Sequence, residues 1–358
     1  MDEIELMLKE LTEAPGVSGY EAGARKLVRK YFSALGELTQ DKLGSLICTM
    51  PGGELAPRVL LAAHMDEIGF MVKLITKEGF IRFTALGGWP NHVLPAQRVV
   101  IQTVNGDIPG VIGIKLPFFM TDEERKQAVE KKDMFIDIGA TSEKEVEGAG
   151  VRIGDPVVPA SEFTALDIPH KTYLAKAFDD RAGNAVCIAA MRELGSTSHP
   201  NTVIGAATVQ EEVGTRGAAT TVESVNPDVA IILEVDIAGD TPGIKPEESA
   251  IKFGAGPCLL AYDARMIPNI KLRDMVIDTA KEQGIPIQLS TIEVGATDGS
   301  VIHLHKTGVP TVVLSVPTRY LHSHNSMMRR DDFDATVKLA AAVVRRLDRD
   351  AAAQLCEW

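Results

Sequence analysis

Residues 58–69 of the chain read RVLLAAHMDEIG. The apolar run from Arg58 to Ala63 predicts a buried strand, and this strand leads directly into His64 and Asp66. Four more clusters of carboxylates or imidazoles follow apolar, β-rich runs: Asp179-Asp180, Glu211-Glu212, Glu234 with Asp236, and His322 with His324. In open α/β sheets, ligands bind outside the carboxyl ends of the strands. The five clusters therefore predict one site assembled by folding, and we expect it to hold two metal ions.

The sequence changes character after this stretch. Residues 67–163 contain β-rich runs broken by Gly and Pro, and the Asn105-Gly106 pair predicts a hairpin, so we expect a small β-barrel or sandwich. From residue 164 onward, apolar strands alternate with helices, which predicts a mostly parallel sheet covered on both faces. The expected architecture is therefore α/β: a catalytic domain formed by residues 1–66 and 164–358, interrupted by a β-rich domain at residues 67–163.

Composition and charge exclude several classes of function. The chain has 358 residues, enough for two domains, and its net charge of −12 argues against a nucleic-acid partner, because such proteins need a basic surface. No apolar run reaches the length of a membrane span, and the acidic, amphipathic start lacks the apolar region of a signal peptide. The four cysteines lie far apart without C-x-x-C spacing, which indicates reduced thiols in a cytoplasmic protein.

Each cluster taken alone also has an ordinary structural interpretation. His64 and Asp66 could be a buried histidine beside a capping carboxylate. Asp179 and Asp180 precede an amphipathic helix and could serve as its N-cap and first-turn acid. A carboxylate at such a turn can equally bridge two cations, as paired ions about 3.5–4 Å apart require. Both interpretations hold if one aspartate bridges the two cations and the other caps the helix or orients a neighbouring side chain.

Acidic pairs at two later strand ends can supply different groups for metal-assisted hydrolysis. Adjacent side chains at a strand end point in opposite directions, so one of Glu211 and Glu212 can be a metal ligand and the other a general base. Glu234 and Asp236 share one side of their strand, which gives one ligand and one spare carboxylate. Carboxylates combined with imidazoles suit Zn²⁺, Co²⁺ or Mn²⁺ and differ from the thiolates of a structural zinc site.

Seven segments follow one another along the chain: APGVSGYE, AAHMDEIGF, FDDRAG, QEEVGTRGA, AGDTPG, GATDGS and PTRYLHS. Together they resemble the motifs of the M42 family of dinuclear metallo-aminopeptidases, which includes tetrahedral aminopeptidases, glutamyl aminopeptidases and relatives once described as endoglucanases. The match covers nearly the whole chain. The resemblance implies an enzyme that releases N-terminal residues from peptides, using water activated by two divalent ions, Zn²⁺ or Co²⁺, with Mn²⁺ as a third choice.

The resemblance also implies roles for individual residues. It gives five metal ligands: His64, Asp179, Glu212, Glu234 and His322. Asp179 matches the carboxylate that bridges both ions, Glu211 matches the general base, and Asp66 matches the acid that orients His64. Glu234 stands where family members commonly carry Asp, and we prefer it to Asp236 as the fifth ligand. The accessory candidates are Asp180, Asp236 and Asp298, and no family role transfers to His324.

In the resembled family, the inserted β domain mediates assembly. The resemblance therefore implies a hollow homo-oligomer, commonly a dodecamer built from dimers, in which the active sites face inward. Such confinement would admit peptides as substrates and exclude folded proteins.

Three other functions remain open from the residues alone. A related carboxypeptidase or N-deacylase would use the same metals with a cationic pocket, for which Arg181, Arg216 and Arg319 lie beside the motifs. An endoglucanase would need two carboxylates flanking the sugar bond and no metal. A metal-stabilised scaffold without activity would not need an uncoordinated acid such as Glu211 beside the metal-bound water.

Overall fold

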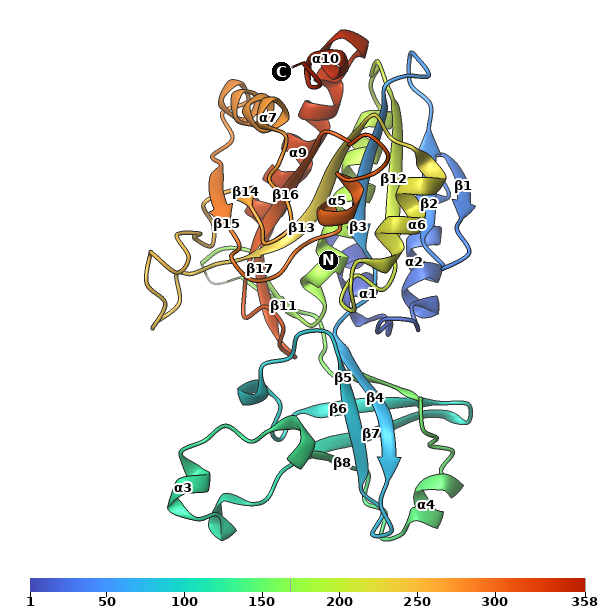
Figure 1. Ribbon diagram of the computed structural model, residues 1–358, viewed down its shortest axis with the longest axis vertical. Coiled ribbons are helices and arrows are strands. Elements are labelled where there is room, and N and C mark those ends of the chain that lie inside the picture. Colours follow the sequence, from blue (N-terminus) through green and yellow to red (C-terminus); the bar gives the residue numbers. More distant parts are fainter. Residues whose placement is uncertain (168, 358) are drawn as a thin grey trace.

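The computed structural model describes residues 1–167 and 169–357. Residue 168 and residue 358, the last of the expected catalytic domain, lie outside the described residues. The chain forms two bodies joined end to end (Figure 1). The larger is a sheet with helices on both faces, and the smaller is a closed β-barrel below one edge of that sheet. This arrangement confirms the expected α/β fold with an inserted small β domain.

The larger body is built on a mixed sheet of 11 described strands. Its centre consists of four parallel neighbours in the order β12 (Thr202–Thr208), β3 (Arg58–His64), β13 (Val229–Ile237) and β16 (Thr311–Arg319). Antiparallel strands extend both sides: β2 (Leu46–Met50) and β1 (Glu37–Gln40) beyond β12, and β17 (Ser326–Arg329), β11 (Thr172–Ala175) and β10 (Thr164–Leu166) beyond β16. β14 (Cys258–Tyr262) pairs with β16 and, in parallel, with β15 (Gln288–Thr291). Parallel pairing is thus limited to the centre and this last pair.

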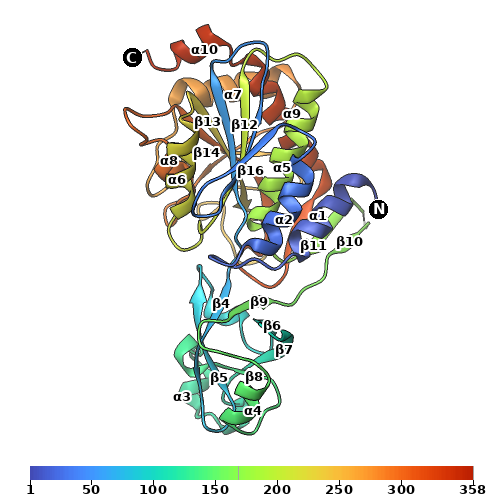
Figure 2. The ribbon, with the colours of Figure 1, turned by 90° about the vertical axis from the view of Figure 1, so that its right-hand side faces the viewer.

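Helices cover both faces of the sheet, which explains why the central strands are apolar throughout. Along β3, Val59 and Leu61 belong to one core and Leu60 and Ala62 to the other, because successive side chains point to opposite faces. The first face packs against α1 (Glu3–Glu13), α2 (Ala22–Phe32), α5 (Phe178–Gly195), α7 (Ile270–Glu282) and α9 (Arg330–Arg346). The second packs against α6 (Arg216–Val225) and α8 (Gly299–Ile302), and Figure 2 shows the two layers. No described helix combines the length and apolarity needed to cross a membrane.

The smaller body is a closed barrel in which all strand pairs are antiparallel. Around the barrel the strands are β4 (Gly69–Ile75), β5 (Ile81–Leu86), β8 (Phe135–Asp137), β7 (Gly106–Gly113), β6 (Arg98–Thr103) and β9 (Pro156–Pro159). Phe70 and Trp89 stack in its interior with ring centroids 4.9 Å apart. The pairing of Thr103 with Gly106 confirms the expected hairpin. Two short helices, α3 (Asp122–Arg125) and α4 (Glu143–Gly148), accompany the barrel strands.

The barrel joins the sheet at the edge where the parallel strands end, because β3 leaves the sheet at His64 and β4 begins at Gly69. A buried ion pair fixes this junction. The ammonium nitrogen of Lys176 lies 2.7 and 2.6 Å from the two carboxylate oxygens of Glu67, and the Gly16 N–H also donates to Glu67. The junction therefore holds the inserted body directly against the carboxyl ends of the central strands.

Candidate metal centre

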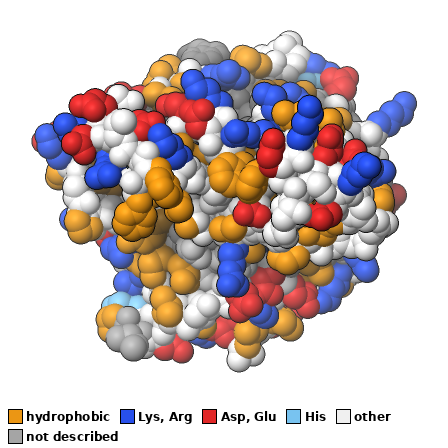
Figure 3. All heavy atoms as spheres, turned by 90° about the horizontal axis from the view of Figure 1, so that it is seen from below, with side chains coloured by type: hydrophobic (Ala, Val, Ile, Leu, Met, Phe, Trp, Pro, Cys, Tyr) orange, Lys and Arg blue, Asp and Glu red, His pale blue; other side chains and the backbone are white. Residues whose placement is uncertain are grey.

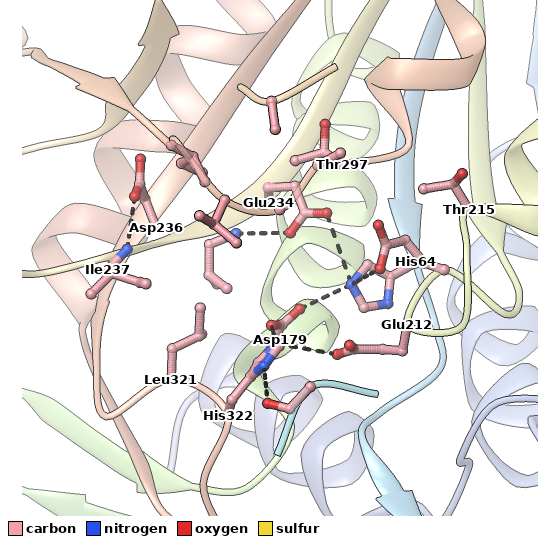
Figure 4. A pocket seen from close by; sticks show the side chains of 18 of the residues that line it. His64, Asp179, Glu212, Thr215, Glu234, Asp236, Ile237, Thr297, Leu321 and His322 are labelled. Carbon is pink, nitrogen blue, oxygen red and sulfur yellow. Dashed lines mark hydrogen bonds and ion pairs between the residues drawn. The ribbon is translucent and has the colours of Figure 1, made fainter. Parts of the chain in front are cut away.

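The carboxyl ends of the central strands bring the five sequence clusters together (Figure 4). His64 is the last residue of β3. Glu211 and Glu212 follow β12, and Glu234 lies in β13. Asp179 lies in the first turn of α5, and His322 follows β16. Because β12, β3, β13 and β16 are adjacent and parallel, these side chains meet at one edge of the sheet.

Asp179 lies between two imidazoles. Its Oδ1 is 2.9 Å from His64 Nε2, and its Oδ2 is 3.1 Å from His322 Nε2. The two oxygens of one carboxylate thus face two different histidines. A ligand shared by two neighbouring cations requires such an arrangement.

Each histidine also faces a glutamate. His64 Nε2 is 3.8 Å from Glu234 Oε1 and 3.9 Å from Glu211 Oε2, whereas His322 Nε2 is 3.6 Å from Glu212 Oε1. The cluster can therefore be divided into two sets of side chains. One set contains His64 and Glu234, the other contains His322 and Glu212, and the carboxylate between the histidines belongs to both.

Contacts outside the cluster turn each imidazole so that Nε2 faces inward. His64 Nδ1 is 3.0 Å from the backbone oxygen of Asp66, and His322 Nδ1 is 2.8 Å from the backbone oxygen of Gly88. In the tautomer that donates an N–H from Nδ1 to these oxygens, Nε2 is left free to bind a metal. Gly88 lies in the loop after β5, so the barrel orients a histidine of the larger body.

Asp66 is a fully buried acceptor that ties three segments together. Its carboxylate accepts hydrogen bonds from Ser18 Oγ at 2.6 Å, from the Glu211 N–H at 2.9 Å and from the Glu212 N–H at 3.2 Å. Burial acts to raise the pKa of Asp66, but its contact with His64 and these hydrogen bonds lower the pKa overall. The residue therefore remains ionised and fixes the acidic turn after β12 relative to β3.

Asp180 has a different environment from its neighbour Asp179. Its Oδ1 accepts from the Gly183 N–H at 2.9 Å, and its Oδ2 accepts from the His64 N–H at 3.2 Å. Ligand-type atoms of His64, Asp180 and Glu234 lie within 4.8 Å of one another, so a metal contact is geometrically accessible. Through these two hydrogen bonds the Asp180 side chain connects the first turns of α5 to the end of β3.

Two contributions to the site were not anticipated from the sequence. Ser18 binds Asp66 from the loop after α1, and the Gly87-Gly88 loop packs against the ligand-type residues. A Cβ atom on Gly87 would approach Glu212 Oε2 to 3.0 Å, and one on Gly88 would approach His322 Nδ1 to 3.1 Å. The Gly-Gly pair after an apolar run was the available sequence signal, because glycine allows close backbone approach.

Asp298 and His324 lie near the cluster without facing the two central histidines. Asp298 accepts a hydrogen bond from the Thr208 hydroxyl, and burial raises its pKa to about 6. His324 packs against Trp89 with ring centroids 5.1 Å apart, and burial lowers its pKa to about 4. His324 therefore belongs to the contact between the larger body and the barrel.

The cluster contains more carboxylate side chains than cationic side chains. Burial and neighbouring carboxylates raise the pKa of Glu211 and Glu234, and they raise that of Glu212 to about 8. Burial opposes protonation of His322, yet its contacts with Asp179 and Glu212 raise its pKa to about 10. Among the described residues, no group donates a hydrogen bond to the buried Oε1 of Glu212. Two divalent cations would supply the missing positive charge, and the donor set of carboxylates and imidazoles fits them.

A cavity of about 770 Å³ opens in front of the cluster. Its other walls include residues 235–237 of β13, the loop at 292–297, residues 214–215 after Glu212, Pro90 of the barrel, Arg265 and Leu321. Asp236 lies at the far side, with its side chain directed away from the His64–Asp179 contact (Figure 4). The cavity therefore has a metal-ligand end and a separate end lined by β13 and the loop.

The three arginines considered for a carboxylate-binding pocket do not line this cavity. Arg181 is fully buried and donates to backbone oxygens around it. Arg319 pairs with Asp240, and Arg216 donates to Gln210.

We expect the metal-free protein to lose stability as the pH rises from about 5 to 8. Folding raises the pKa of Glu212 from 4.5 to about 8 and that of His322 from 6.5 to about 10. The folded state therefore binds more protons than the unfolded state over this interval, and the free energy of unfolding falls as the pH increases. Urea denaturation of chelated protein at pH 5, 6, 7 and 8 measures the trend.

Added Zn²⁺ is the control for this prediction, because metal binding to deprotonated ligands strengthens with pH. The difference in free energy of unfolding between the metal-loaded and the chelated protein should therefore be largest at pH 8. A chelated protein that becomes steadily more stable from pH 5 to 8 would contradict the charge balance described above.

Comparison with known proteins agrees with the geometry. A family model described as M42 glutamyl aminopeptidase matches residues 44–339, and a short model described as AMPT matches residues 2–27. A protein of Escherichia coli K12, described as putative aminopeptidase FrvX, is 41% identical over 337 residues, which cover 93% of this chain and 92% of that protein.

Two solved structures share the complete fold. The TET aminopeptidase of the marine sediment archaeon Thaumarchaeota archaeon SCGC AB-539-E09 is 46% identical with a TM-score of 0.96, covering 99% of both chains. The TET1 peptidase of Pyrococcus horikoshii is 33% identical with a TM-score of 0.86, covering 96% of this chain and 100% of that chain. The latter is described as assembling into a tetrahedron or a large octahedral shell.

Proposed function

Because the chain belongs to the M42 family and is a metal-dependent aminopeptidase, we propose that it holds two divalent ions around Asp179. His64, Asp179 and Glu234 would hold one ion, and Asp179, Glu212 and His322 the other. The position of Asp179 carries this proposal, since its two oxygens face different imidazoles. Zn²⁺ or Co²⁺ suits these ligands best, with Mn²⁺ as a third choice.

Glu234 is our fifth ligand because of where its carboxylate lies. Its Oε1 is 3.8 Å from His64 Nε2, whereas the side chain of Asp236, on the same strand, is directed away from the cluster. The glutamate thus takes the place that aspartate commonly holds in the family, and Asp236 remains the spare carboxylate.

When bound, the ions lower the pKa of the attacking water and polarise the peptide carbonyl. Glu211 moves the proton: its carboxylate lies 3.9 Å from His64 Nε2, farther than Asp179, and its backbone N–H is held by Asp66. Burial and neighbouring carboxylates raise its pKa, which favours uptake of a proton and its return to the leaving amine. The free α-amino group of the peptide would bind beside one ion and one carboxylate of the cluster, which makes the enzyme an exopeptidase.

Replacing Glu211 with Gln should lower kcat by about 10²–10⁴-fold, the usual contribution of a general base, while both metal ions remain bound. The amide preserves the shape of the side chain but cannot take the proton. Elemental analysis and steady-state kinetics of the purified variant measure the two effects.

The matched control for this variant is Asp179→Ala, which removes the shared ligand. It should lose metal as well as activity. Near-normal kcat in Glu211→Gln would refute the base, and full metal content in Asp179→Ala would refute the shared ligand.

A carboxypeptidase or N-deacylase would require a cation placed to bind a substrate carboxylate. Arg265 is the single arginine or lysine among the described residues that line the metal cavity, and it is exposed. The three arginines named by the motifs are engaged elsewhere. The many carboxylates instead favour a substrate with a free amino group.

Amino-acid p-nitroanilides should therefore be hydrolysed, and their N-acetylated counterparts should be inert. Free N-acyl amino acids should also be inert. The assay is run with Zn²⁺ and with Co²⁺ after chelation, and the chelated enzyme is the negative control. Faster release from an N-acylated amino acid than from the free-amino p-nitroanilide would favour the deacylase instead.

We also propose that the chain assembles into a homo-oligomer, built from dimers into a dodecamer, with peptides as substrates. A structure of PhTET1 holds a dodecamer. In this chain, Figure 3 shows hydrophobic side chains gathered on the face that includes the barrel end of the molecule. Phe118 and Phe119, between β7 and α3, are 88% and 74% exposed. Together with the other hydrophobic side chains of this face, this exposed aromatic pair supports burial of the barrel between subunits.

Light scattering should give a mass near twelve times the chain mass of 38.5 kDa. The double variant Phe118→Glu/Phe119→Glu should shift the enzyme to smaller species, because buried charges without partners oppose association. Leu55→Glu is the control, since Leu55 is 85% exposed in the loop before β3, at the opposite end of the sheet from the barrel. A stable wild-type monomer would refute the assembly.

We also propose that the protein is located in the cytoplasm. The four cysteines are all free, and Cys48, Cys187 and Cys258 are buried in the larger body. This fits a chain kept in a reducing compartment.

A further inference from the structure

A second cavity, of about 740 Å³, adjoins the one that contains the metal cluster. The two share a wall formed by Asp236, Ile237 and residues 292–294. The carboxylates of four residues line the second cavity: Asp236, Glu247, Glu248 and Glu293. Among the described residues, neither lysine nor arginine lines it. A concave surface lined by one sign of charge concentrates ligands of the opposite sign.

Asp236 is the buried member of this set and has an incomplete hydrogen-bond shell. The residue is only 5% exposed. Its Oδ1 accepts from the Ile237 N–H at 2.8 Å, whereas its Oδ2 is buried with no donor among the described residues. The Ser290 hydroxyl, which also lines the second cavity, interacts with the Asp236 carboxylate and opposes the rise in its pKa that burial causes, but among the described residues its oxygen reaches no partner in full hydrogen-bond geometry. Unpaired polar groups of this kind are costly to bury, so a ligand that donates to them is favoured.

The position of Asp236 relates it directly to the metal cluster. It lies two residues beyond Glu234 on β13, and strand residues two apart project from the same face about 6.6 Å from each other. The four-carbon stem of a lysine side chain can span such a distance. A peptide whose first residue lies at the cluster would therefore place the end of a long side chain near Asp236.

We propose that Asp236 determines specificity for the side chain of the substrate's first residue, and that this pocket takes lysine or arginine. The inference rests on the proposed aminopeptidase site, which positions that residue. Ile237, Ile292 and Val294 supply apolar walls for the methylene stem, and Asp236 with Ser290 meets the cationic end. Glu293 adds a second, exposed carboxylate at the shared wall.

Arg265 argues against a preference for lysine or arginine, because it lines the metal cavity and would favour a substrate with an acidic side chain. It is exposed and therefore strongly screened by solvent, whereas Asp236 is buried and interacts through a medium of lower dielectric constant. The buried carboxylate should consequently decide the preference.

The test compares p-nitroanilides of lysine, norleucine and glutamate on the metal-loaded enzyme. Norleucine has the lysine stem without the ammonium group. We expect kcat/KM for lysine to exceed that for norleucine by about 10- to 100-fold, the contribution of a hydrogen bond to a charged group. A norleucine or glutamate substrate that is hydrolysed faster than lysine would overturn the proposal. Failure of all three substrates would instead refute the aminopeptidase site itself.

Asp236→Asn keeps the size of the side chain and removes its charge. The lysine-to-norleucine ratio of kcat/KM should fall close to one, and metal content is measured alongside because Glu234 is nearby. Glu293→Gln is a second, independent variant and should lower the ratio by a smaller factor. Asp350→Asn, which removes an exposed charge in α10 (Arg349–Gln354), should leave the ratio unchanged. An unchanged ratio in either cavity variant, or an equal loss in Asp350→Asn, would contradict the assignment.

Discussion

The structure depends on a single carboxylate shared by two imidazoles. Asp179 faces His64 with one oxygen and His322 with the other, at 2.9 and 3.1 Å. These two histidines come from β3 and from the loop after β16, strands separated in the sheet by β13. A parallel centre is therefore required, because it delivers both strand ends to one edge. The helix that carries Asp179 must begin at that same edge, and the buried hydrogen bonds of Asp180 connect its first turns to the end of β3.

The barrel is part of this site as well as a separate body. Its Gly88 carbonyl accepts from the imidazole of His322, and the buried Glu67–Lys176 pair holds the chain where it passes into the barrel. Removing either partner of such a pair would leave an uncompensated buried charge. Movement of the barrel relative to the sheet would therefore alter the orientation of the His322 imidazole.

Much of this arrangement was accessible from the sequence, because strand ends followed by carboxylates and imidazoles carry a clear pattern. The convergence of the clusters follows from that pattern, whereas the fold class follows from the alternation of strands and helices and the hairpin from Asn105-Gly106. The antiparallel edge strands did not, since short strands such as β10 and β17 carry little periodicity. The partner of His322 was also inaccessible, because a backbone carbonyl has no side-chain signature. Ser18 was visible only as part of a motif, since its role depends on a contact 48 residues away.

Glu234 and Asp236 show how one strand end can serve two purposes. Both side chains are buried, burial raises the pKa of both carboxyl groups, and the strand rise places the two Cα atoms about 6.6 Å apart. Without metal, the acids of the cluster would compete with Asp236 for any cationic side chain. With two ions bound, the charge of the cluster is compensated, and Asp236 becomes the buried carboxylate that still lacks a partner. Metal binding would then do more than prepare the reaction: it would direct a cationic side chain away from the cluster and into its own pocket.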